Sequence, residues 1–346
     1  MEAASAMFGA ADRTPPFRDN RGAVLPGSVA EAGFHRIGVT RQWVLMRGRS
    51  RDNPLLVVLH GGPGSSETAP LRARNAALED AYVVVYWDQR GAGRSYRGDI
   101  DPASMTAERF VTDLDELMTL VLARFGKTRA VLLGHSWGSV LGVLYAARRP
   151  ERVSAYVGVG QVADMAASEA ASYAFVLAEA ERRGHRRALK DLRAIGPPPH
   201  DRKGIGRQRR WLTALGGATG PRFSLPRLGW AALMTPEASL GDLVRLVQGS
   251  SLSIRLMLDE LIGTNLARDH PRLEVPVFFI LGRHDHQVVA EISAAYFEAL
   301  QAPSKRLFWL ERSGHFLPFE EPEAFNRIMI DEVRPVALGA PGSAPT

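Results

Sequence analysis

The sequence predicts an α/β fold: a mostly parallel sheet covered by helices on both faces, with an inserted helical cap. Short apolar runs alternate with helix-like segments up to about residue 160, as expected for a sheet built from strand, helix, strand units. The alternation resumes at residues 276–281 and 305–311. Between these two parts the regular segments are all helix-like. A chain of 346 residues is long enough for one large domain with such an insertion.

The amino-terminal half contains a series of candidate strands and two clear helices. Strands are expected at residues 34–39, 42–46, 55–59, 82–87, 130–134 and 153–159. Apolar side chains recur with helical spacing from Thr106 to Phe125, and Gly126 would end that helix. A second helix is expected from Trp137 to about Arg149. Continuous apolar strands indicate burial on both faces of the sheet, which is typical of parallel sheets.

The middle of the chain, residues 162–270, is the predicted cap. Helix-like segments at residues 163–183 and 240–262 are separated by the Gly- and Pro-rich stretches 196–199 and 216–221. A helical insertion here would lie over the end of the sheet, exclude water and select the substrate. The remaining boundaries are a flexible tail at 1–27, a core at 28–161 and 271–334, and a flexible tail at 335–346.

Residues 134–138 read Gly-His-Ser-Trp-Gly, between an apolar run and a helix-like segment. In this context the G-x-S-x-G pattern forms a sharp turn that exposes the serine at the carboxyl edge of the sheet. The flanking glycines let the strand and the helix pass close together. Ser136 is therefore the candidate nucleophile.

A serine nucleophile needs a histidine base, and the histidine needs a carboxylate that orients it. In this type of fold the chain order is serine, acid, histidine. Asp285 directly follows the apolar run 276–281, and His315 follows the strand candidate 305–311. Both would lie at the same edge of the sheet as Ser136. His135 and His60 are expected to support neighbouring loops.

An oxyanion that develops during acyl transfer needs hydrogen-bond donors. One donor in this architecture is the backbone N–H after the nucleophile, which belongs to Trp137. The second comes from the loop after an early strand, here the Gly-rich stretch 60–64, where Gly62 is the most plausible donor.

Three separated motifs carry a resemblance to a known family: residues 60–64 (HGGPG), 87–95 (WDQRGAGRS) and 136–139 (SWGS). Together they resemble the proline iminopeptidase family of α/β-hydrolases. The resemblance covers most of residues 40–160 and 275–325. It implies the α/β-hydrolase fold, with an eight-stranded sheet, and cleavage of a peptide or another acyl bond without a metal or organic cofactor.

Two features depart from that family's pattern. Members that release an amino-terminal proline usually have glycine at the position of His135, and the resemblance implies that glutamates of their cap hold the substrate's ammonium group. Here residues 209–215 place no acid beside Trp211. Two substrate classes therefore stay open: an ester, lactone or amide of a small molecule, and a short peptide with a free amino terminus. A non-catalytic binding protein of the same fold is a third reading.

The cap offers candidate substrate-binding residues and a strong positive charge. The candidates are Glu169, which could hold an amine, and the aromatic residues Tyr173, Trp211 and Trp230. Residues 182–210 contain eleven Lys and Arg against two Asp, a balance of +9 that exceeds the +6 of the whole chain. This segment could attract an anionic substrate.

Composition narrows the remaining possibilities. The chain has no cysteine, which excludes disulfides and thiolate metal sites. No motif for nucleic-acid binding accompanies the positive charge. The first residues do not form a signal peptide, and no apolar run approaches the roughly 18 residues of a membrane span. We predict a cytoplasmic enzyme that needs no cofactor or metal and acts on a small molecule or short peptide, with no nucleic-acid or membrane partner.

Overall fold

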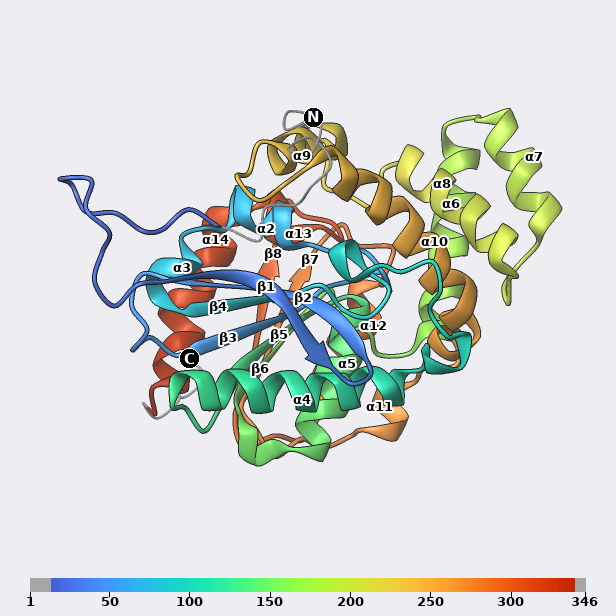
Figure 1. Ribbon diagram of the computed structural model, residues 1–346. Helices are drawn as coiled ribbons and strands as arrows, with labels where there is room; N and C mark the ends of the chain where they lie inside the picture. Colours follow the sequence, from blue (N-terminus) through green and yellow to red (C-terminus); the bar gives the residue numbers. More distant parts are fainter. Residues whose placement is uncertain (1–13, 340–346) are drawn as a thin grey trace.

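The computed structural model describes residues 14–339 and contains one eight-stranded sheet at its centre (Figure 1). Its order is β1-β2-β4-β3-β5-β6-β7-β8; β1 and β2 run antiparallel to their neighbours, and all other pairs are parallel. This confirms the predicted mostly parallel sheet. The strands are β1 Val29–Ile37, β2 Thr40–Gly48, β3 Leu55–Leu59, β4 Val83–Trp87, β5 Ala130–His135, β6 Val153–Val159, β7 Val277–Gly282 and β8 Lys305–Leu310.

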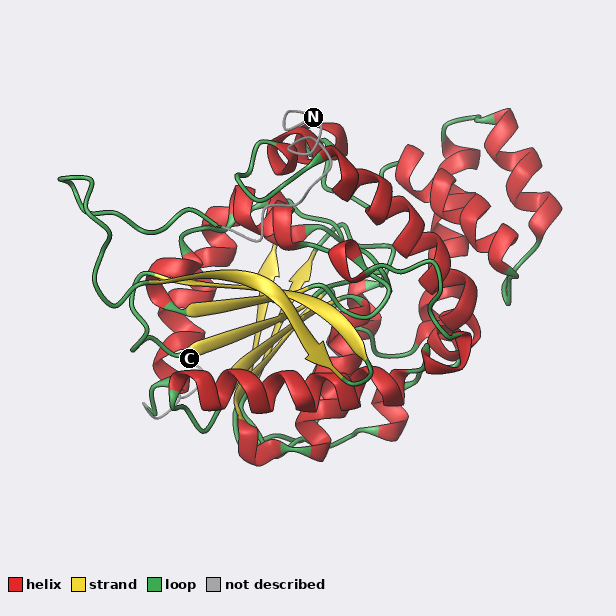
Figure 2. Ribbon diagram, in the orientation of Figure 1, coloured by secondary structure: helices red, strands yellow, loops and turns green. Residues whose placement is uncertain are grey.

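Helices cover both faces of the sheet, as Figure 2 shows. Alternate residues of β3 point to opposite faces: Leu55 and Val57 join one apolar core, while Leu56 and Val58 join the other. The first core packs against α4 (Ala107–Phe125) and α5 (Trp137–Arg148), and the second against α2 (Thr68–Arg74), α3 (Leu78–Ala81) and α14 (Pro322–Arg327). Burial on both faces explains why the central strands read as continuous apolar runs.

The helices of the described residues include the four expected at residues 106–125, 137–149, 163–183 and 240–262, and the others were not predicted from the sequence. The helices are α2 Thr68–Arg74, α3 Leu78–Ala81, α4 Ala107–Phe125, α5 Trp137–Arg148, α6 Met165–Arg182, α7 Arg186–Ile195, α8 Arg202–Ala214, α9 Leu225–Leu233, α10 Leu240–Ile262, α11 Leu266–Asp269, α12 Ala290–Ala299, α13 Leu317–Glu320, α14 Pro322–Arg327 and α15 Arg334–Ala337. Short 3₁₀ turns occur at η1 Gly93–Ser95, η2 Pro102–Ser104 and η3 Pro150–Arg152, and a π-helical turn at η4 Ile328–Val333.

Helix α4 illustrates how local sequence sets the boundaries. The Thr106 side chain accepts a hydrogen bond from the N–H of Arg109 and caps the start of the helix. Gly126 ends it in the left-handed conformation, with φ of 63°. Both ends agree with the prediction. Strand β1 differs from it, since it begins five residues before the expected Phe34; an edge strand with exposed side chains lacks the apolar run that marks a buried one.

Helices α6 to α11 lie between β6 and β7 and form the cap (Figure 1). The expected segments 163–183 and 240–262 correspond to α6 and α10. Parts of the two predicted tails are ordered: Arg18 pairs with Val24 in an isolated bridge, and α15 extends past residue 335. The other parts, residues 1–13 and 340–346, lie outside the described residues. Among the described helices, none has the length and apolarity of a membrane span.

A buried ion pair anchors the segment that follows β4. The Arg90 guanidinium donates to both carboxylate oxygens of Asp113 on α4, at 2.9 and 3.0 Å. Gln42 of β2 donates to the same carboxylate at 2.7 Å. Because all three side chains are buried, removing any one leaves a charge or a polar group without its partner, which typically costs about 3–5 kcal/mol for an ion pair. The motif at residues 87–95 thus joins the sheet to α4.

Candidate active site

Ser136 lies in a sharp turn between β5 and α5, in a backbone conformation that non-glycine residues avoid. Its φ is 53° and its ψ is −118°, and within residues 14–339 it is the sole non-glycine residue with positive φ. The turn depends on close backbone contacts. A Cβ at Gly138 would lie 1.8 Å from the carbonyl oxygen of Leu59, and one at Gly134 would lie 2.4 Å from that of Gly138. Glycine is therefore required on both sides of Ser136.

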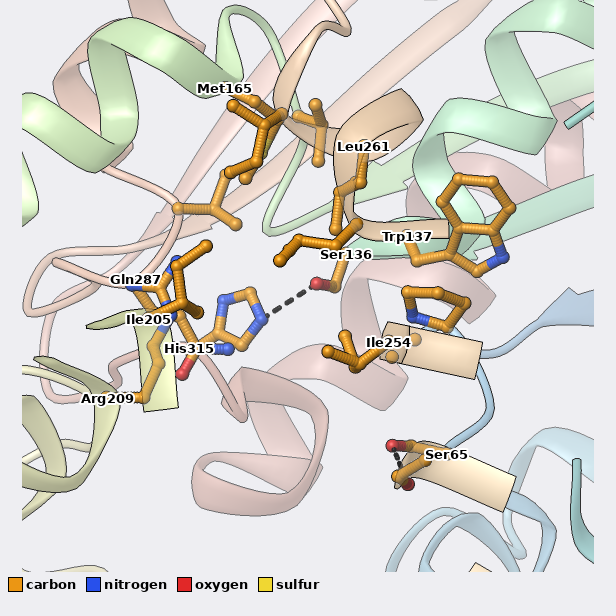
Figure 3. Close-up of a pocket in the computed structure, with 18 of the residues that line it drawn as sticks. Ser65, Ser136, Trp137, Met165, Ile205, Arg209, Ile254, Leu261, Gln287 and His315 are labelled. Atoms are coloured by element: carbon orange, nitrogen blue, oxygen red, sulfur yellow. Dashed lines mark hydrogen bonds between the residues drawn. The ribbon is translucent and has the colours of Figure 1, made fainter. Parts of the chain in front are cut away.

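Three side chains that are far apart in sequence form a hydrogen-bonded chain at the carboxyl edge of the sheet. Ser136 Oγ lies 3.0 Å from Nε2 of His315, in the loop after β8 (Figure 3). Nδ1 of His315 lies 2.7 Å from Oδ2 of Asp285, in the loop after β7. Since a carboxylate only accepts, Nδ1 carries the proton and Nε2 is free to accept the Ser136 hydroxyl proton. These are the three residues that the sequence placed at this edge.

Backbone donors fix the Asp285 carboxylate. Its Oδ1 accepts hydrogen bonds from the N–H groups of Gln287 at 2.9 Å and Val288 at 3.0 Å, which leaves Oδ2 for His315. The carboxylate of Glu320 holds the His315 loop, because it accepts from the N–H groups of Gly314 and Phe316 on either side of the histidine. Burial raises the pKa of Glu320 by more than the hydrogen bonds from these N–H groups lower it.

The two predicted oxyanion donors both line the pocket beside Ser136. Trp137 is the first residue of α5, so its N–H has no partner within the helix. In residues 14–339 the N–H of Gly62 also forms no hydrogen bond. The loop is close to the serine: a Cβ on Gly61 would lie 3.3 Å from Cβ of Ser136. Two unpaired N–H groups next to a serine hydroxyl are what an oxyanion requires.

His135 links the Gly-rich loop to His315 as a buried cation. Its Nδ1 lies 2.6 Å from Oε1 of Glu67, and its Nε2 lies 2.8 Å from the carbonyl oxygen of His315. Both partners are acceptors, so both ring nitrogens carry protons. Burial opposes this charge, but the Glu67 carboxylate and the hydrogen bonds outweigh it and raise the pKa of His135. The same Glu67 oxygen accepts from the N–H of Gly61.

Gln89 connects the segments that carry the two N–H groups. Its amide donates to the carbonyl oxygen of His60 at 3.1 Å and accepts from the Trp137 indole at 3.2 Å. His60 Nδ1 donates to the carbonyl of Gly61 and its Nε2 accepts from the N–H of Gln89. Burial lowers the pKa of His60, in accord with this neutral ring. His60 therefore orients the Gly-rich loop, as expected from the sequence.

A pocket of about 610 Å³ lies between the cap and the turn that holds Ser136. Figure 3 shows Met165, Leu261 and Ile254 around the serine hydroxyl, with Arg209 beyond His315. The rest of the wall combines apolar side chains, polar ones such as Ser250 and Gln287, and charged groups. Its cations other than histidine are Arg202, Lys203 and Arg209, and its carboxylates are Glu67 and Glu169.

Glu169 lines the pocket but is already paired. It forms an ion pair with Arg209 and accepts from the amide of Gln208 at 3.3 Å. Its side chain is only 3% exposed. The other two cations, Arg202 and Lys203, form neither an ion pair nor a side-chain hydrogen bond within residues 14–339. The pocket thus presents positive charge rather than a free cap carboxylate.

None of the three predicted aromatic residues of the cap lines this pocket. Tyr173 and Trp211 pack in the cap's own apolar core, between α6, α7 and α8. Trp230 lies on α9 and is 65% exposed. Large aromatic residues in a helical insertion can pack the helices against one another or contact a ligand. Their spacing along the sequence did not distinguish these two roles.

Glu67, Gln89 and Glu320, whose contacts hold the loops around Ser136, were not identified from the sequence. Gln89 lies two residues past the end of β4, a position that could have drawn attention to it, whereas Glu67 lies eight residues past the end of β3 and carries no such signal. Within residues 14–339 no group of three or more histidine and carboxylate side chains is arranged to hold a metal ion.

Comparison with known proteins shows the family to which the chain belongs. Residues 54–322 match the family described as alpha/beta hydrolase fold. A probable aminopeptidase of Bacillus subtilis, YbaC, is 34% identical over 291 residues, which is 84% of this chain and 92% of the relative. A probable proline iminopeptidase of Streptomyces coelicolor is 38% identical over 152 residues, 43% of either chain.

Among solved structures, a proline iminopeptidase-related protein from Thermus thermophilus superposes with a TM-score of 0.62. The match covers 90% of this chain and 98% of the other, at 21% identity. At this identity the likeness concerns the fold alone, and the predicted eight-stranded architecture is confirmed.

Proposed function

We propose that this chain, which belongs to the α/β-hydrolase fold family and to its proline iminopeptidase-like branch, is a serine hydrolase with Ser136 as nucleophile. The proposal rests on two hydrogen bonds: His315 Nδ1 lies 2.7 Å from Oδ2 of Asp285, and His315 Nε2 lies 3.0 Å from Oγ of Ser136. Ser136 itself lies in a turn with a positive φ. The function proposed is cleavage of an ester, lactone or amide bond of a small molecule through an acyl-enzyme.

The reaction follows from the hydrogen bonds. Ser136 Oγ attacks the substrate carbonyl carbon while His315 Nε2 takes the hydroxyl proton. The carbonyl oxygen becomes an oxyanion and accepts from the N–H groups of Gly62 and Trp137. Asp285 holds His315 and stabilises its positive charge. The carbon to leaving-group bond then breaks and His315 gives the proton to the leaving group; water attacks the acyl-enzyme by the same steps and frees Ser136.

The pocket's charge favours a substrate with an anionic group. Three arginine and lysine side chains line it against two carboxylates, and protonated His135 adds a further positive charge. Glu67 and Glu169, which could otherwise hold an amine, are paired with His135 and Arg209. An ammonium group would enter against this field, whereas a carboxylate or phosphate would be attracted by Arg202 and Lys203.

A second candidate function is an aminopeptidase that releases an amino-terminal residue from a short peptide. The similarity to YbaC, a probable aminopeptidase that aligns with 84% of this chain, favours it. Its substrate would need a carboxylate for the free amine, and among the described residues Glu67 Oε2 is the carboxylate oxygen of the pocket that accepts no hydrogen bond. A binding protein without activity would need neither the Ser136, His315 and Asp285 side chains in this arrangement nor the N–H groups of Gly62 and Trp137 beside them.

Two substrate panels distinguish the candidates. Purified protein is assayed with p-nitrophenyl esters, with and without a terminal carboxylate, and with unblocked prolyl and alanyl naphthylamides. Ser136→Ala is the control in every assay. We expect turnover of the esters, with a higher kcat/KM for the anionic ones, and a loss of activity in Ser136→Ala. A clear preference for unblocked aminoacyl amides would favour the aminopeptidase. Tight binding of either ligand class without turnover would favour the binding protein.

A further inference from the structure

A second cavity, of about 550 Å³, lies beside the pocket of Ser136. We call it the side chamber. It is bounded by α2 on the core and by α9 and α10 of the cap. Most of its wall is carbon, and the larger apolar side chains that line it include Trp43, Leu225, Leu228, Leu246, Phe316 and Phe319. Its size and apolar wall are those of a small-molecule site.

The charged groups that line the side chamber form ion pairs or hydrogen bonds. Arg72 pairs with Glu79 at 2.7 Å and with Glu237 at 3.2 Å. Arg94 pairs with Asp242 at 3.2 Å. Asp88, which also lines the chamber, accepts a hydrogen bond from the N–H of Arg94 at 2.8 Å. What remains for a ligand is the apolar wall, so the chamber favours a hydrocarbon group over an ion.

The side chamber and the pocket share part of their walls. Ser65, Glu67, Ser250 and Phe316 line both cavities. Ser65 Oγ and Ser250 Oγ form a hydrogen bond of 2.9 Å between the Gly-rich loop and α10, drawn in Figure 3. Glu67 contacts His135, and Phe316 directly follows His315 in the chain. The chamber therefore lies next to the reacting atoms.

The side chamber also reaches the protein surface. Leu243 and Val247 of α10 line it and are 41% and 70% exposed. Trp230 and Met234, at α9, are exposed apolar side chains of the same part of the cap. Exposed apolar groups gathered on two neighbouring helices are unusual away from a binding site. Through Leu243 and Val247 the apolar wall of the chamber extends to the protein surface.

We propose that the side chamber binds an apolar chain of the substrate while the carbonyl group lies at Ser136. This inference rests on the proposed hydrolase function and names its substrate class: an acyl compound with a medium-length hydrocarbon chain. Each methylene that leaves water for an apolar wall strengthens binding by about fourfold. The specificity constant should therefore rise with chain length until the chamber is full.

Gly229 offers a direct way to fill the chamber. It lies on the face of α9 that also carries Leu225, Leu228 and Ala232, and it lines the chamber. A Cβ at Gly229 would meet no heavy atom within 4 Å. In Gly229→Phe the new ring therefore occupies the chamber without a backbone clash. Gly206 is a matched position, since it lines the pocket on α8 and its Cβ site is equally open.

The test compares kcat/KM for p-nitrophenyl octanoate and p-nitrophenyl acetate. In the wild type we expect the octanoate to acetate ratio to exceed ten, and in Gly229→Phe we expect it to fall at least tenfold. Gly33→Phe, on β1 with no atom within 4 Å of its Cβ site, controls for the substitution itself and should keep the wild-type ratio. A wild-type ratio near one would overturn the proposal. So would a ratio that falls in Gly206→Phe but not in Gly229→Phe, because the chain would then lie in the pocket.

A binding measurement separates this inference from the hydrolase proposal. Decanoate is titrated calorimetrically into Ser136→Ala and into Ser136→Ala combined with Gly229→Phe, each checked for folding by thermal unfolding. We expect binding to weaken at least tenfold in the double variant. This result would support the chamber even if the wild type cleaved no ester, an outcome that would count against the hydrolase alone. Absence of decanoate binding, or equal binding to both proteins, would refute the chamber.

Discussion

Replacing Asp285 with asparagine is expected to reduce kcat about 10⁴-fold while the fold stays intact. The magnitude follows from the hydrogen bonds of the buried carboxylate. Its Oδ1 accepts from two backbone N–H groups, those of Gln287 and Val288, so the amide oxygen of asparagine must take that place. The amide NH₂ then faces His315 Nδ1.

This orientation forces the wrong tautomer of His315. An NH₂ group donates, so Nδ1 must accept and the ring proton moves to Nε2, the atom that should accept the Ser136 proton. Turning the amide over would place its NH₂ against two buried N–H donors, at about 1–3 kcal/mol for each unsatisfied group. Loss of the correct tautomer in a Ser-His-Asp enzyme costs about 10⁴ in kcat, or ~5.5 kcal/mol in the transition state.

The assay is steady-state hydrolysis of p-nitrophenyl acetate by the wild type, Asp285→Asn and Glu311→Gln. Glu311 is a surface carboxyl group that pairs with Arg283, so its conversion to an amide is a matched control and should keep wild-type turnover. Thermal unfolding verifies that each variant is folded. If folded Asp285→Asn kept more than a tenth of the wild-type kcat, the assignment of Asp285 as the orienting acid would be wrong.

Two further predictions concern the surroundings of His315. Gly160→Ala should lower both stability and turnover, because Gly160 has φ of 52° and a Cβ there would lie 3.3 Å from Nδ1 of His315. Chemical denaturation should show a loss of about 1–3 kcal/mol in the free energy of unfolding. Wild-type stability together with wild-type turnover in this variant would contradict the packing. Glu67→Gln should cost more stability at pH 6 than at pH 9. The pKa of His135 is raised in the folded protein, so the protonated ring adds stability in full at pH values below the pKa of the unfolded state, near 6.5. This stability is lost as the pH rises through the pKa of the folded state. An equal cost of Glu67→Gln at both pH values would contradict a cationic His135.

Local patterns predicted the sheet, the long helices and the turn of Ser136 because each depends on neighbours in sequence. Helix α4 begins and ends at the residues that cap it. The glycines on either side of Ser136 are required because the backbone of nearby residues and of β3 approaches them closely. The positions of Asp285 and His315 followed from chain order and strand ends, since parallel strands present their carboxyl ends at one edge.

The lining of the pocket depends on how the cap helices pack, and periodicity does not encode it. Glu169 is an acid close to β6 in sequence, yet Arg209 of α8 takes its carboxylate. Trp211 packs inside the cap and Trp230 faces solvent, although both are large aromatic residues in helices. Glu67 contacts His135, which is 68 residues away in the sequence, and no short motif predicts such a contact.

The identity of the nucleophile is the central claim, and active-site labelling tests it most directly. The protein is treated with a fluorophosphonate, digested and analysed by mass spectrometry, in parallel with an assay of ester hydrolysis. We predict one adduct, on the peptide that contains Ser136, with loss of turnover in proportion to labelling and no adduct in Ser136→Ala. Hydrolysis that persists in Ser136→Ala, or an adduct on another residue, would contradict the account.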